Sequence, residues 1–248
     1  AVKFTGGPLL ILAGAGSGKT RVLTYRVAYL ISQGVAPEEI ILLTFTNKAS
    51  EEMLRRISGI KPIGGTFHSF CARLLRRDNP DFVIFDQADQ LDTIKQAMVA
   101  VGVDPKAVKP ASVLHTISQA KNELIGPQEY ADYARGDFQK MVVRVYLAYQ
   151  QLLKKFKALD FDDLLMETVK LLREQPEERC KYILVDEYQD TNKAQYEITK
   201  LLAKKYRNLT VVGDASQAIY SWRGADYRNL QLLKQDFPDL TTINLEQN

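Results

Sequence analysis

The feature that most constrains the fold of this chain is a glycine-rich turn between an apolar segment and a helical pattern. Residues Leu9–Ala13 are apolar and short enough for a buried strand, and AGAGSGKT occupies residues 13–20. An amphipathic pattern then begins, with Leu23, Val27 and Leu30 on one face of a predicted helix. A strand, a glycine-rich turn and a helix in this order are typical of phosphate-binding loops in parallel α/β folds.

The residue types in this turn suit a triphosphate. Its glycines allow backbone N–H groups to turn inward around phosphate oxygens, and the start of the helix adds a partial positive charge. Lys19 can then reach the β- and γ-phosphates, and the Thr20 hydroxyl can bind Mg²⁺. The predicted nucleotide-binding residues of the turn are Ala13, Gly14, Ala15, Gly16, Ser17, Gly18, Lys19, Thr20 and Arg21. The alternative interpretation is a strand–helix turn that binds no ligand.

A second candidate part of the same site is the acidic pair in ILVDEYQDT, residues 183–191. A buried strand delivers Asp186 to its carboxyl end, where ligands bind in open α/β sheets. There Asp186 would hold Mg²⁺, directly or through water, and Glu187 would act as the general base for an attacking water. An acidic pair alone is often a solvated turn, and it indicates phosphoryl transfer only in combination with the glycine-rich turn. A base for water also argues against a P-loop kinase, which needs an acceptor site instead.

The remaining apolar segments predict an α/β fold with a helical insertion. Segments typical of buried strands recur at residues 40–45, 182–185, 209–212 and 241–245. Helical patterns lie between them, and strand-like segments vanish from Asp86 to Lys157. We therefore predict a parallel sheet covered by helices, formed by residues 1–85 and 158–248, with a helical subdomain inserted over residues 86–157.

Composition excludes several classes of protein. The chain is 46% hydrophobic and 25% charged, as in ordinary globular proteins, and no stretch approaches the roughly 18 consecutive apolar residues of a membrane span. Its first residues lack the basic start and apolar core of a signal peptide. Cys71 and Cys180 have no CxxC partner, and with His68 and His115 they form no zinc-binding spacing. We therefore expect reduced thiols in a cytoplasmic protein. The net charge of +3 is too small to indicate nucleic acid by itself.

Further motifs identify a family. The AGAGSGKT turn and the DEYQD segment resemble those of the UvrD, Rep and PcrA group of superfamily 1 DNA helicases. The same resemblance is carried, in the family's order, by TFTNKASEEM (44–53), GTFHSF (65–70), DFDDLL (160–165) and GDASQAIYSWRGAD (213–226). It implies a RecA-like motor domain, called 1A, that carries an inserted helical subdomain, called 1B. It also implies movement along single-stranded DNA in the 3′-to-5′ direction, driven by ATP with Mg²⁺.

The resemblance assigns roles that residue types alone do not. Gln217 is implied to sense the γ-phosphate, which makes it a predicted nucleotide-binding residue and, beside Lys19 and Glu187, a predicted catalytic residue. Aromatic side chains stack on unpaired bases, at about 1–3 kcal/mol per base. The implied DNA-binding residues are Phe45, Thr46, Asn47, Thr66, Phe67, His68, Tyr220, Trp222 and Arg223.

Simpler interpretations of three of these residues stay open. Without the resemblance, Asn47 would be a helix N-cap, His68 a partly buried polar residue and Trp222 a core residue. The chain also departs from the family pattern at Ser216, where an acidic residue is usual, and at Ala218, where serine is usual. The link between Ile57 and Gly64 is short for the group.

The two ends of the chain resemble interrupted motifs. Ala1-Val2 resembles the tail of an upstream motif whose glutamine reads adenine, and LEQN at residues 245–248 resembles the start of the next motif. The resemblance implies a second motor domain beyond it, with an arginine finger worth about 10³–10⁵ in rate. We therefore expect residues 1–248 alone to hydrolyse ATP poorly and to unwind no DNA. The implied partners are single-stranded DNA, junctions of single and double strands, the remaining helicase domains and repair or replication proteins, but no membrane.

Three alternatives are weighed against a helicase motor. The motor part of a helicase–nuclease usually carries much larger insertions than residues 86–157. A nucleic-acid-binding module with an inactive P-loop is disfavoured by the intact Lys19, Thr20, Asp186 and Glu187. A nucleotide kinase or other P-loop transferase is disfavoured by Glu187 and by the aromatic loop.

Overall fold

The computed structural model describes residues 1–14, 17–57, 62–214 and 227–245. The chain divides into two compact units, which are Ala1–Phe70 with Leu171–Asn248, and Cys71–Lys170. The second unit extends beyond the predicted helical segment 86–157 at both ends, because short strands on either side of that segment pair with each other.

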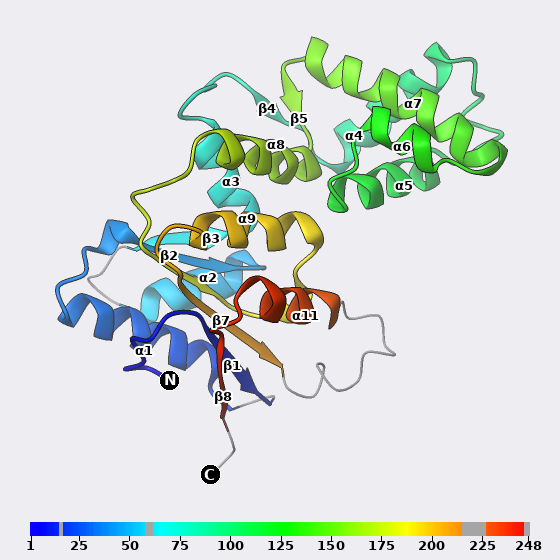
Figure 1. Cartoon of the computed structure of the whole chain (residues 1–248). Coiled ribbons are helices and arrows are strands. Elements are labelled where there is room, and N and C mark those ends of the chain that lie inside the picture. Colours follow the sequence, from blue (N-terminus) through cyan, green and yellow to red (C-terminus); the bar gives the residue numbers. More distant parts are fainter. Residues whose placement is uncertain (15–16, 58–61, 215–226, 246–248) are drawn as a thin grey trace. The chain divides into compact units, whose positions relative to one another are not determined.

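The first unit is built on a parallel sheet in the order β3-β2-β6-β7-β1-β8 (Figure 1). Its strands are β1 (Leu9–Ala13), β2 (Ile40–Thr44), β3 (Ile63–Thr66), β6 (Tyr182–Val185), β7 (Asn208–Asp214) and β8 (Thr241–Leu245). Strands β1, β2, β6 and β7 are almost wholly buried, as expected for apolar parallel strands with both faces covered. The predicted α/β fold with a parallel sheet is thereby confirmed.

Helices of the first unit pack apolar faces onto this sheet. They are α1 (Lys19–Ser32), α2 (Asn47–Arg56), α9 (Lys193–Ala203) and α11 (Tyr227–Asp236), with 3₁₀ turns η1 (Pro37–Glu39) and η2 (Tyr188–Asp190). Leu23, Val27 and Leu30 of α1 are buried in one cluster with residues of β1 and β2, so the predicted amphipathic face is the packed one. Helix α9 begins after a capping box in which Asn192 and Gln195 bond each other's main chain.

The strand order places four loops at one edge of the sheet. In a parallel sheet all carboxyl ends lie on the same side, and β6, β7 and β1 are consecutive neighbours. The register pairs Ala13 with Asp214 and Val185 with Val211. The loops that follow β1, β2, β6 and β7 therefore lie close together at this edge, although they are far apart in the sequence.

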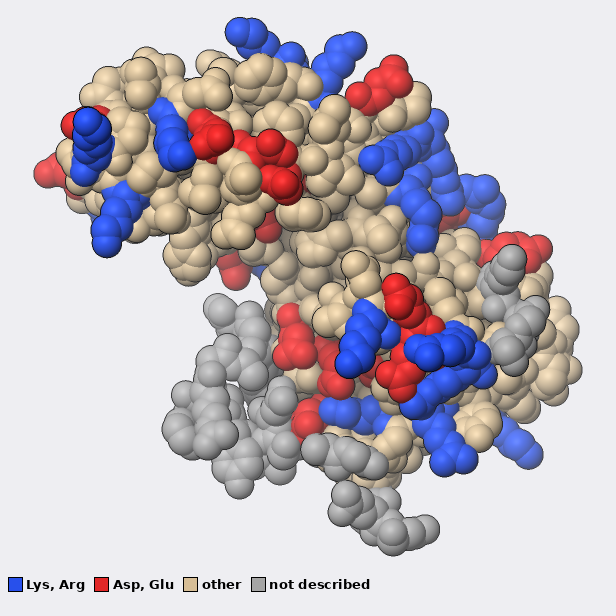
Figure 2. Space-filling model, turned by 180° about the vertical axis from the view of Figure 1, so that it is seen from behind, with Lys and Arg blue, Asp and Glu red and all other residues tan. Residues whose placement is uncertain are grey.

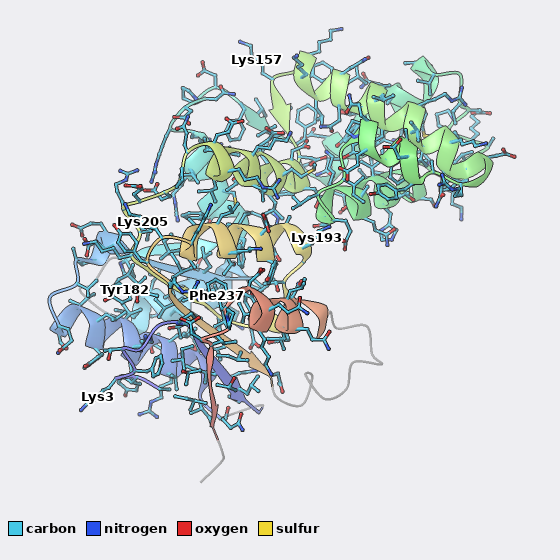
Figure 3. The ribbon with its side chains drawn as sticks, viewed as in Figure 1. Lys3, Lys157, Tyr182, Lys193, Lys205 and Phe237 are labelled. Atoms are coloured by element: carbon cyan, nitrogen blue, oxygen red, sulfur yellow. The ribbon has the colours of Figure 1, made fainter. Side chains whose placement is uncertain are left out.

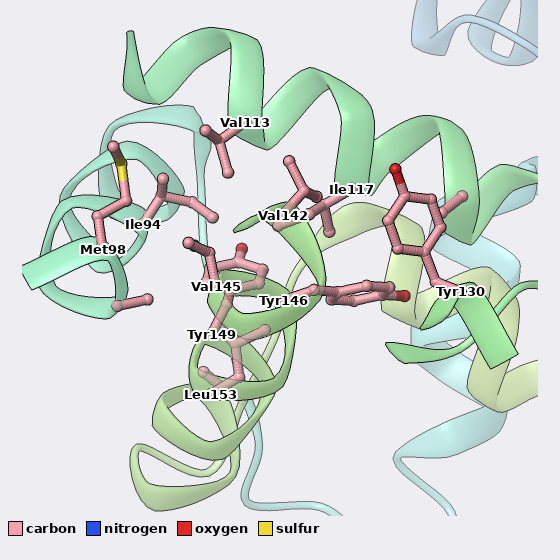
Figure 4. Close-up of a cluster of buried hydrophobic side chains, with 13 residues drawn as sticks. Ile94, Met98, Val113, Ile117, Tyr130, Val142, Val145, Tyr146, Tyr149 and Leu153 are labelled. Carbon is pink, nitrogen blue, oxygen red and sulfur yellow. The ribbon is translucent and has the colours of Figure 1, made fainter. Parts of the chain in front are cut away.

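The second unit is mainly helical, and α4, α5 and α6 pack on or beside the long α7. It contains α4 (Gln87–Ala100), α5 (Pro110–Asn122), α6 (Pro127–Tyr133), α7 (Gly136–Lys155) and a parallel pair of strands, β4 (Val83–Ile84) and β5 (Ala158–Leu159). The chain enters and leaves the unit within α3 (Phe67–Leu75) and α8 (Phe161–Glu174). Figure 4 shows its core, in which Tyr146 and Tyr149 of α7 lie among aliphatic side chains of α4 and α5.

A buried charge network occupies the second unit. The Lys121 side chain is fully buried, and its Nζ lies 2.6 Å from Asp160 Oδ2 and 2.8 Å from Asp163 Oδ1. The Tyr149 hydroxyl donates to Asp160 Oδ2 at 3.0 Å. Burial alone would lower the pKa of Lys121, but the two carboxylates outweigh it and raise that pKa. The network thus holds a fully charged lysine inside the unit.

Both carboxylates of this network also organise the start of α8. The backbone N–H of Asp163 donates to Asp160 Oδ1 at 2.8 Å, and that of Asp160 donates to Asp163 Oδ2 at 3.3 Å. This reciprocal pair is a capping box, which satisfies amides at the helix start. The DFDDLL motif therefore has a structural role in this unit.

Two expectations about the environment of the chain concern its cysteines and its helices. Cys71 and Cys180 are both buried and form no disulfide. Burial raises the pKa of the Cys71 thiol to about 12, which leaves it protonated and unreactive at neutral pH. Among the described residues, no helix combines the length and the apolar character needed to cross a bilayer.

Candidate nucleotide-binding site

The described residues of the glycine-rich turn form a tight bend between β1 and α1. Ser17 Oγ donates to the Gly14 carbonyl at 2.6 Å, which closes the bend on itself. Gly18 is left-handed, with φ 85°, and precedes the first residue of α1, Lys19. Only glycine adopts this conformation without strain, so the motif's third glycine is required where the helix begins. Ala15 and Gly16 lie outside the described residues.

The structure brings the turn and the acidic pair together. Lys19 Nζ lies 3.1 Å from Glu187 Oε2 and 3.3 Å from Asp214 Oδ2. Thr20 Oγ1 donates to Asp186 Oδ2 at 3.2 Å. These contacts join the start of α1, the loop after β6 and the last residue of β7, so the candidate site lies at the edge predicted from strand polarity. A pocket of about 560 Å³ opens there, lined by residues of these segments and of the loop after β2.

Lys19 carries the charge that phosphate binding needs. Burial alone would lower the pKa of its ammonium, but the neighbouring Glu187 and Asp214 outweigh burial and raise that pKa. The side chain is therefore protonated at neutral pH. It lies between two carboxylates at the N-terminus of α1, where a phosphate would also interact with the positive end of the helix dipole.

Asp186 is a buried carboxylate with spare bonding capacity. Its backbone N–H donates to the Leu43 carbonyl, which fixes the end of β6 against β2. Burial, reinforced by the nearby Glu187 charge, raises the pKa of Asp186 to about 6. Its Oδ1 is buried and has no hydrogen-bond partner among the residues that the structure describes. A carboxylate oxygen of this kind, beside the Thr20 hydroxyl, fits a hard cation with oxygen ligands such as Mg²⁺.

The same burial predicts a stability effect. The folded state holds the Asp186 proton more tightly than an ordinary carboxyl of pKa 3.8, so stability is lost as pH rises from about 4 to about 6. Asp186→Asn should therefore raise the free energy of unfolding at pH 7 by about 1–3 kcal/mol, and the gain should vanish below about pH 4. Denaturant unfolding at several pH values measures this. The matched control is the exposed Asp92→Asn, and an Asp186→Asn protein less stable than wild type at pH 7 would contradict the prediction.

Glu187 takes an unusual backbone conformation at the strand end. Its φ is 46°, in the left-handed region, which costs a residue with a side chain about 1 kcal/mol or more. Its side chain is 38% exposed and reaches the pocket. Strain of this kind persists where surrounding contacts over-determine the conformation. The general base predicted from sequence is thus partly open to solvent, as a base for water must be.

Sequence reasoning missed two polar residues that organise this region. Gln189 is buried and bonds both Glu187 and the main chain of Asp214. Asn229 of α11 is also buried, and its Nδ2 donates to the carbonyl of Thr191 at 2.5 Å and to its hydroxyl at 3.2 Å. No sequence pattern points to the contact of Gln189 with Asp214 or to that of Asn229 with Thr191, because only the tertiary fold brings these residues close. Figure 3 labels Tyr182, where β6 begins, and Lys193, where α9 begins, and the acidic motif lies between these two residues in the chain.

Arg21 differs from its predicted place in the site. The structure puts it on an exposed part of α1, where Nη2 donates to the Tyr25 hydroxyl at 3.1 Å. Its guanidinium also lies over the Tyr25 ring, 5.3 Å from the centroid. Arg21 does not line the pocket that Lys19 and Thr20 line.

The loop after β2 borders the same pocket. Phe45 and Thr46 line it together with Lys19. Thr46 is the N-cap of α2, since its Oγ1 accepts from the Ala49 N–H at 3.1 Å. The alternative that made Asn47 the N-cap is therefore wrong. Asn47 is the exposed first residue of the helix.

The end of β3 and the start of α3 present less to solvent than expected. Phe67 is 1% exposed, and its ring packs on Phe45 with centroids 5.6 Å apart, so a DNA contact there would have to use its main chain. Thr66 is buried, and its Oγ1 accepts from the Ser69 N–H. Burial lowers the pKa of His68, which leaves it neutral at pH 7. The interpretation of His68 as a partly buried polar residue matches its place here.

Other predicted residues lie outside the described part of the chain. They are Gln217, Tyr220, Trp222 and Arg223, together with the two departures from the family pattern, Ser216 and Ala218. Their flanks are described, at Asp214 and at α11. On the face in Figure 2, the Lys and Arg side chains of the described residues form separate groups with Asp and Glu between them.

Comparison with known proteins gives the chain its relatives. Residues 1–238 match the family described as UvrD/REP helicase N-terminal domain. The chain is 50% identical over 267 residues to the ATP-dependent DNA helicase PcrA of Bacillus subtilis (strain 168), with 100% of this chain and 36% of the relative covered. It is 47% identical over 269 residues to the protein of the same name from Staphylococcus aureus (strain COL), with 100% and 37% covered. The chain thus spans little more than a third of these relatives' length. Because the family match covers most of the chain, the protein belongs to the UvrD/REP helicase family.

Proposed function

We propose that this chain is the ATP-binding part of a 3′-to-5′ DNA helicase motor, which couples ATP hydrolysis to movement along single-stranded DNA. The observation that carries the proposal is the meeting of Lys19 and Thr20 with Asp186 and Glu187 at one pocket. The family and the names of the relatives, ATP-dependent DNA helicase PcrA, support the same conclusion.

Each residue of the pocket has a distinct task in this proposal. The glycine-rich turn and Lys19 bind the β- and γ-phosphates, and Thr20 with Asp186 holds Mg²⁺. The ion, when bound, offsets negative charge on the phosphates. Glu187 accepts the proton of the attacking water, because it follows the end of β6 and its side chain is 38% exposed to solvent. Gln217 senses the γ-phosphate, as the resemblance implies.

Single-stranded DNA is the proposed track. Its contacts are assigned to the loop after β2, to the junction of β3 with α3 at residues 66–68, and to Tyr220, Trp222 and Arg223. The exposed Thr46 and Asn47 support the first of these assignments, because they lie at a helix start, where backbone N–H groups suit phosphate oxygens. The first unit would correspond to domain 1A and the second to subdomain 1B. The other partners in this proposal are single–double strand junctions and the remaining helicase domains.

ATP hydrolysis by the full-length protein, with and without a single-stranded oligonucleotide, tests the proposal. A helicase motor should hydrolyse ATP several-fold faster with the oligonucleotide. A kinase would ignore DNA, and a module with an inactive P-loop would show no turnover, so either result would overturn the motor assignment. A helicase–nuclease would in addition cleave the oligonucleotide.

Residues 1–248 alone should behave differently from the full-length protein. We expect nucleotide binding that is weak and turnover at least about 10³-fold slower, because an arginine finger from a second motor domain contributes that much in related phosphoryl transfers. The same assay measures it. Robust DNA-stimulated ATPase activity from residues 1–248 would contradict this expectation.

A further inference from the structure

We infer that Gln189 is a positioning residue for ATP hydrolysis, because its amide holds Glu187 and the carboxyl end of β7 in one arrangement. The inference rests on the proposed function, since a base for water matters only in a site that hydrolyses ATP. Gln189 lies in η2, directly after the acidic pair, and is only 5% exposed. A buried amide of this kind is costly to leave unbonded, so its partners define its place.

Both ends of the Gln189 amide are bonded, and they join two strand ends. Nε2 donates to Glu187 Oε2 at 2.8 Å and to Asp190 Oδ2 at 3.2 Å. Oε1 accepts from the backbone N–H of Asp214 at 3.1 Å. Glu187 and Asp190 follow β6, whereas Asp214 ends β7. One buried side chain therefore connects the proposed base with the strand that leads toward the predicted phosphate sensor.

The Gln189 contact gains importance when phosphate is present. Glu187 Oε2 accepts from two donors, Lys19 and Gln189. A triphosphate in the pocket would compete for the Lys19 ammonium, because phosphate oxygens carry more charge than a single carboxylate oxygen. Gln189 would still hold Glu187 after Lys19 had turned toward the phosphate. The amide therefore keeps the base in place in the state that reacts.

The backbone on both sides accommodates this connection. A Cβ added at Gly213 would lie 3.4 Å from Gln189 Oε1, so the amide approaches the backbone of β7 to van der Waals distance. On the other side, the backbone of Glu187 has a left-handed conformation, which needs support from surrounding contacts. The bond from Gln189 Nε2 supplies part of that support. The close approach of the amide to β7 and the left-handed backbone of Glu187 are both explained if the Gln189 amide has to reach both strand ends.

Gln189→Met in the full-length protein tests the inference, because methionine keeps the length of the side chain and removes all three hydrogen bonds of the amide. We expect kcat for DNA-stimulated ATP hydrolysis to fall about 10- to 100-fold, as for a catalytic group displaced by about 1 Å, while KM for ATP changes less than about threefold. The Gln189→Glu variant should lose at least as much kcat, because a carboxylate at this position would face the carboxylates of Glu187 and Asp190.

The matched control is Gln195→Met. Gln195 is 6% exposed and bonds the Asn192 N–H at 3.0 Å, so it is an equally buried glutamine of the same unit that lies outside the pocket. Its variant should melt at a temperature similar to that of Gln189→Met and retain wild-type kcat. Equal kcat values for the two methionine variants would overturn the inference, and so would a Gln189→Met effect confined to KM. In either case, ATPase activity of the wild-type protein would still support the proposed function. A wild-type protein without ATPase activity would overturn both.

Discussion

Replacing Glu187 by glutamine in the full-length protein should lower kcat for ATP hydrolysis by about 10²–10⁴-fold, the usual contribution of a general base. Glutamine keeps the shape of the side chain and can still bond its neighbours, but it cannot accept a proton from water. Lys19 would lose one of its two carboxylate partners and keep Asp214. The affinity for ATP with Mg²⁺ should therefore be equal to or somewhat higher than that of wild type. Steady-state turnover and equilibrium binding of a fluorescent ATP analogue measure the two quantities separately.

A suitable control for this variant is Glu197→Gln. Glu197 lies on α9, where its Oε1 accepts from Arg173 at 2.9 Å, and it does not line the pocket. Its replacement should leave both kcat and ATP affinity close to wild type. A Glu187→Gln protein with undiminished kcat would mean that another group activates the water, and the role given to Glu187 would have to be abandoned.

The second large effect should come from Lys121→Met, which we expect to lower the free energy of unfolding by about 3–5 kcal/mol. The substitution leaves Asp160 and Asp163 buried without their cation, and uncompensated buried charge is among the most destabilising changes in proteins. Thermal melting of the protein measures the loss of stability, and limited proteolysis shows whether cleavage within residues 71–170 becomes faster. Lys95→Met serves as the control, because its side chain is 52% exposed and its pairing with Asp92 should contribute at most about 1 kcal/mol.

A compensated variant separates charge from packing in this network. Adding Asp160→Asn and Asp163→Asn to Lys121→Met removes all three charges and keeps most of the volume. We expect a substantial part of the lost stability to return, because neutral amides are far cheaper to bury than unpaired carboxylates. If the triple variant were less stable than Lys121→Met, the loss would have to come from the hydrogen bonds of the α8 capping box instead.

Sequence pattern predicted those strands of the sheet whose residues are continuously apolar. The strands LLILA and YILV were predicted at the residues where they occur, because β-branched and leucine-rich segments buried on both faces have a clear signature. The strand TTINL was also predicted at its residues, although its side chains alternate between half-buried and exposed. The strand IGGT was missed, since two glycines give it no apolar pattern. The two-residue strands β4 and β5 were missed as well, because their pairing depends on partners far along the chain.

The candidate site could be predicted where chemistry demands particular residues at fixed spacing. Lys19 and Thr20 follow a turn that only a glycine-rich segment can form, and Asp186 follows an apolar strand, so local sequence was sufficient. The buried partners Gln189 and Asn229 could not be predicted, because their roles depend on which strand ends become neighbours. Phe67 illustrates the opposite case, since its motif indicated DNA but its ring packs on Phe45.

The strand order of the first unit has a consequence for synthesis of the protein. Strand β1, which leads into the phosphate-binding turn, pairs only with β7 and β8 among the described strands. Its first partner, Asn208–Asp214, is synthesised about 200 residues after β1, roughly 10–40 s later at 5–20 residues per second. Until then the apolar β1 segment has no strand partner, and unpaired apolar strands are prone to aggregate. The nascent chain therefore depends on chaperones or on transient burial of β1 until translation of this region is nearly complete.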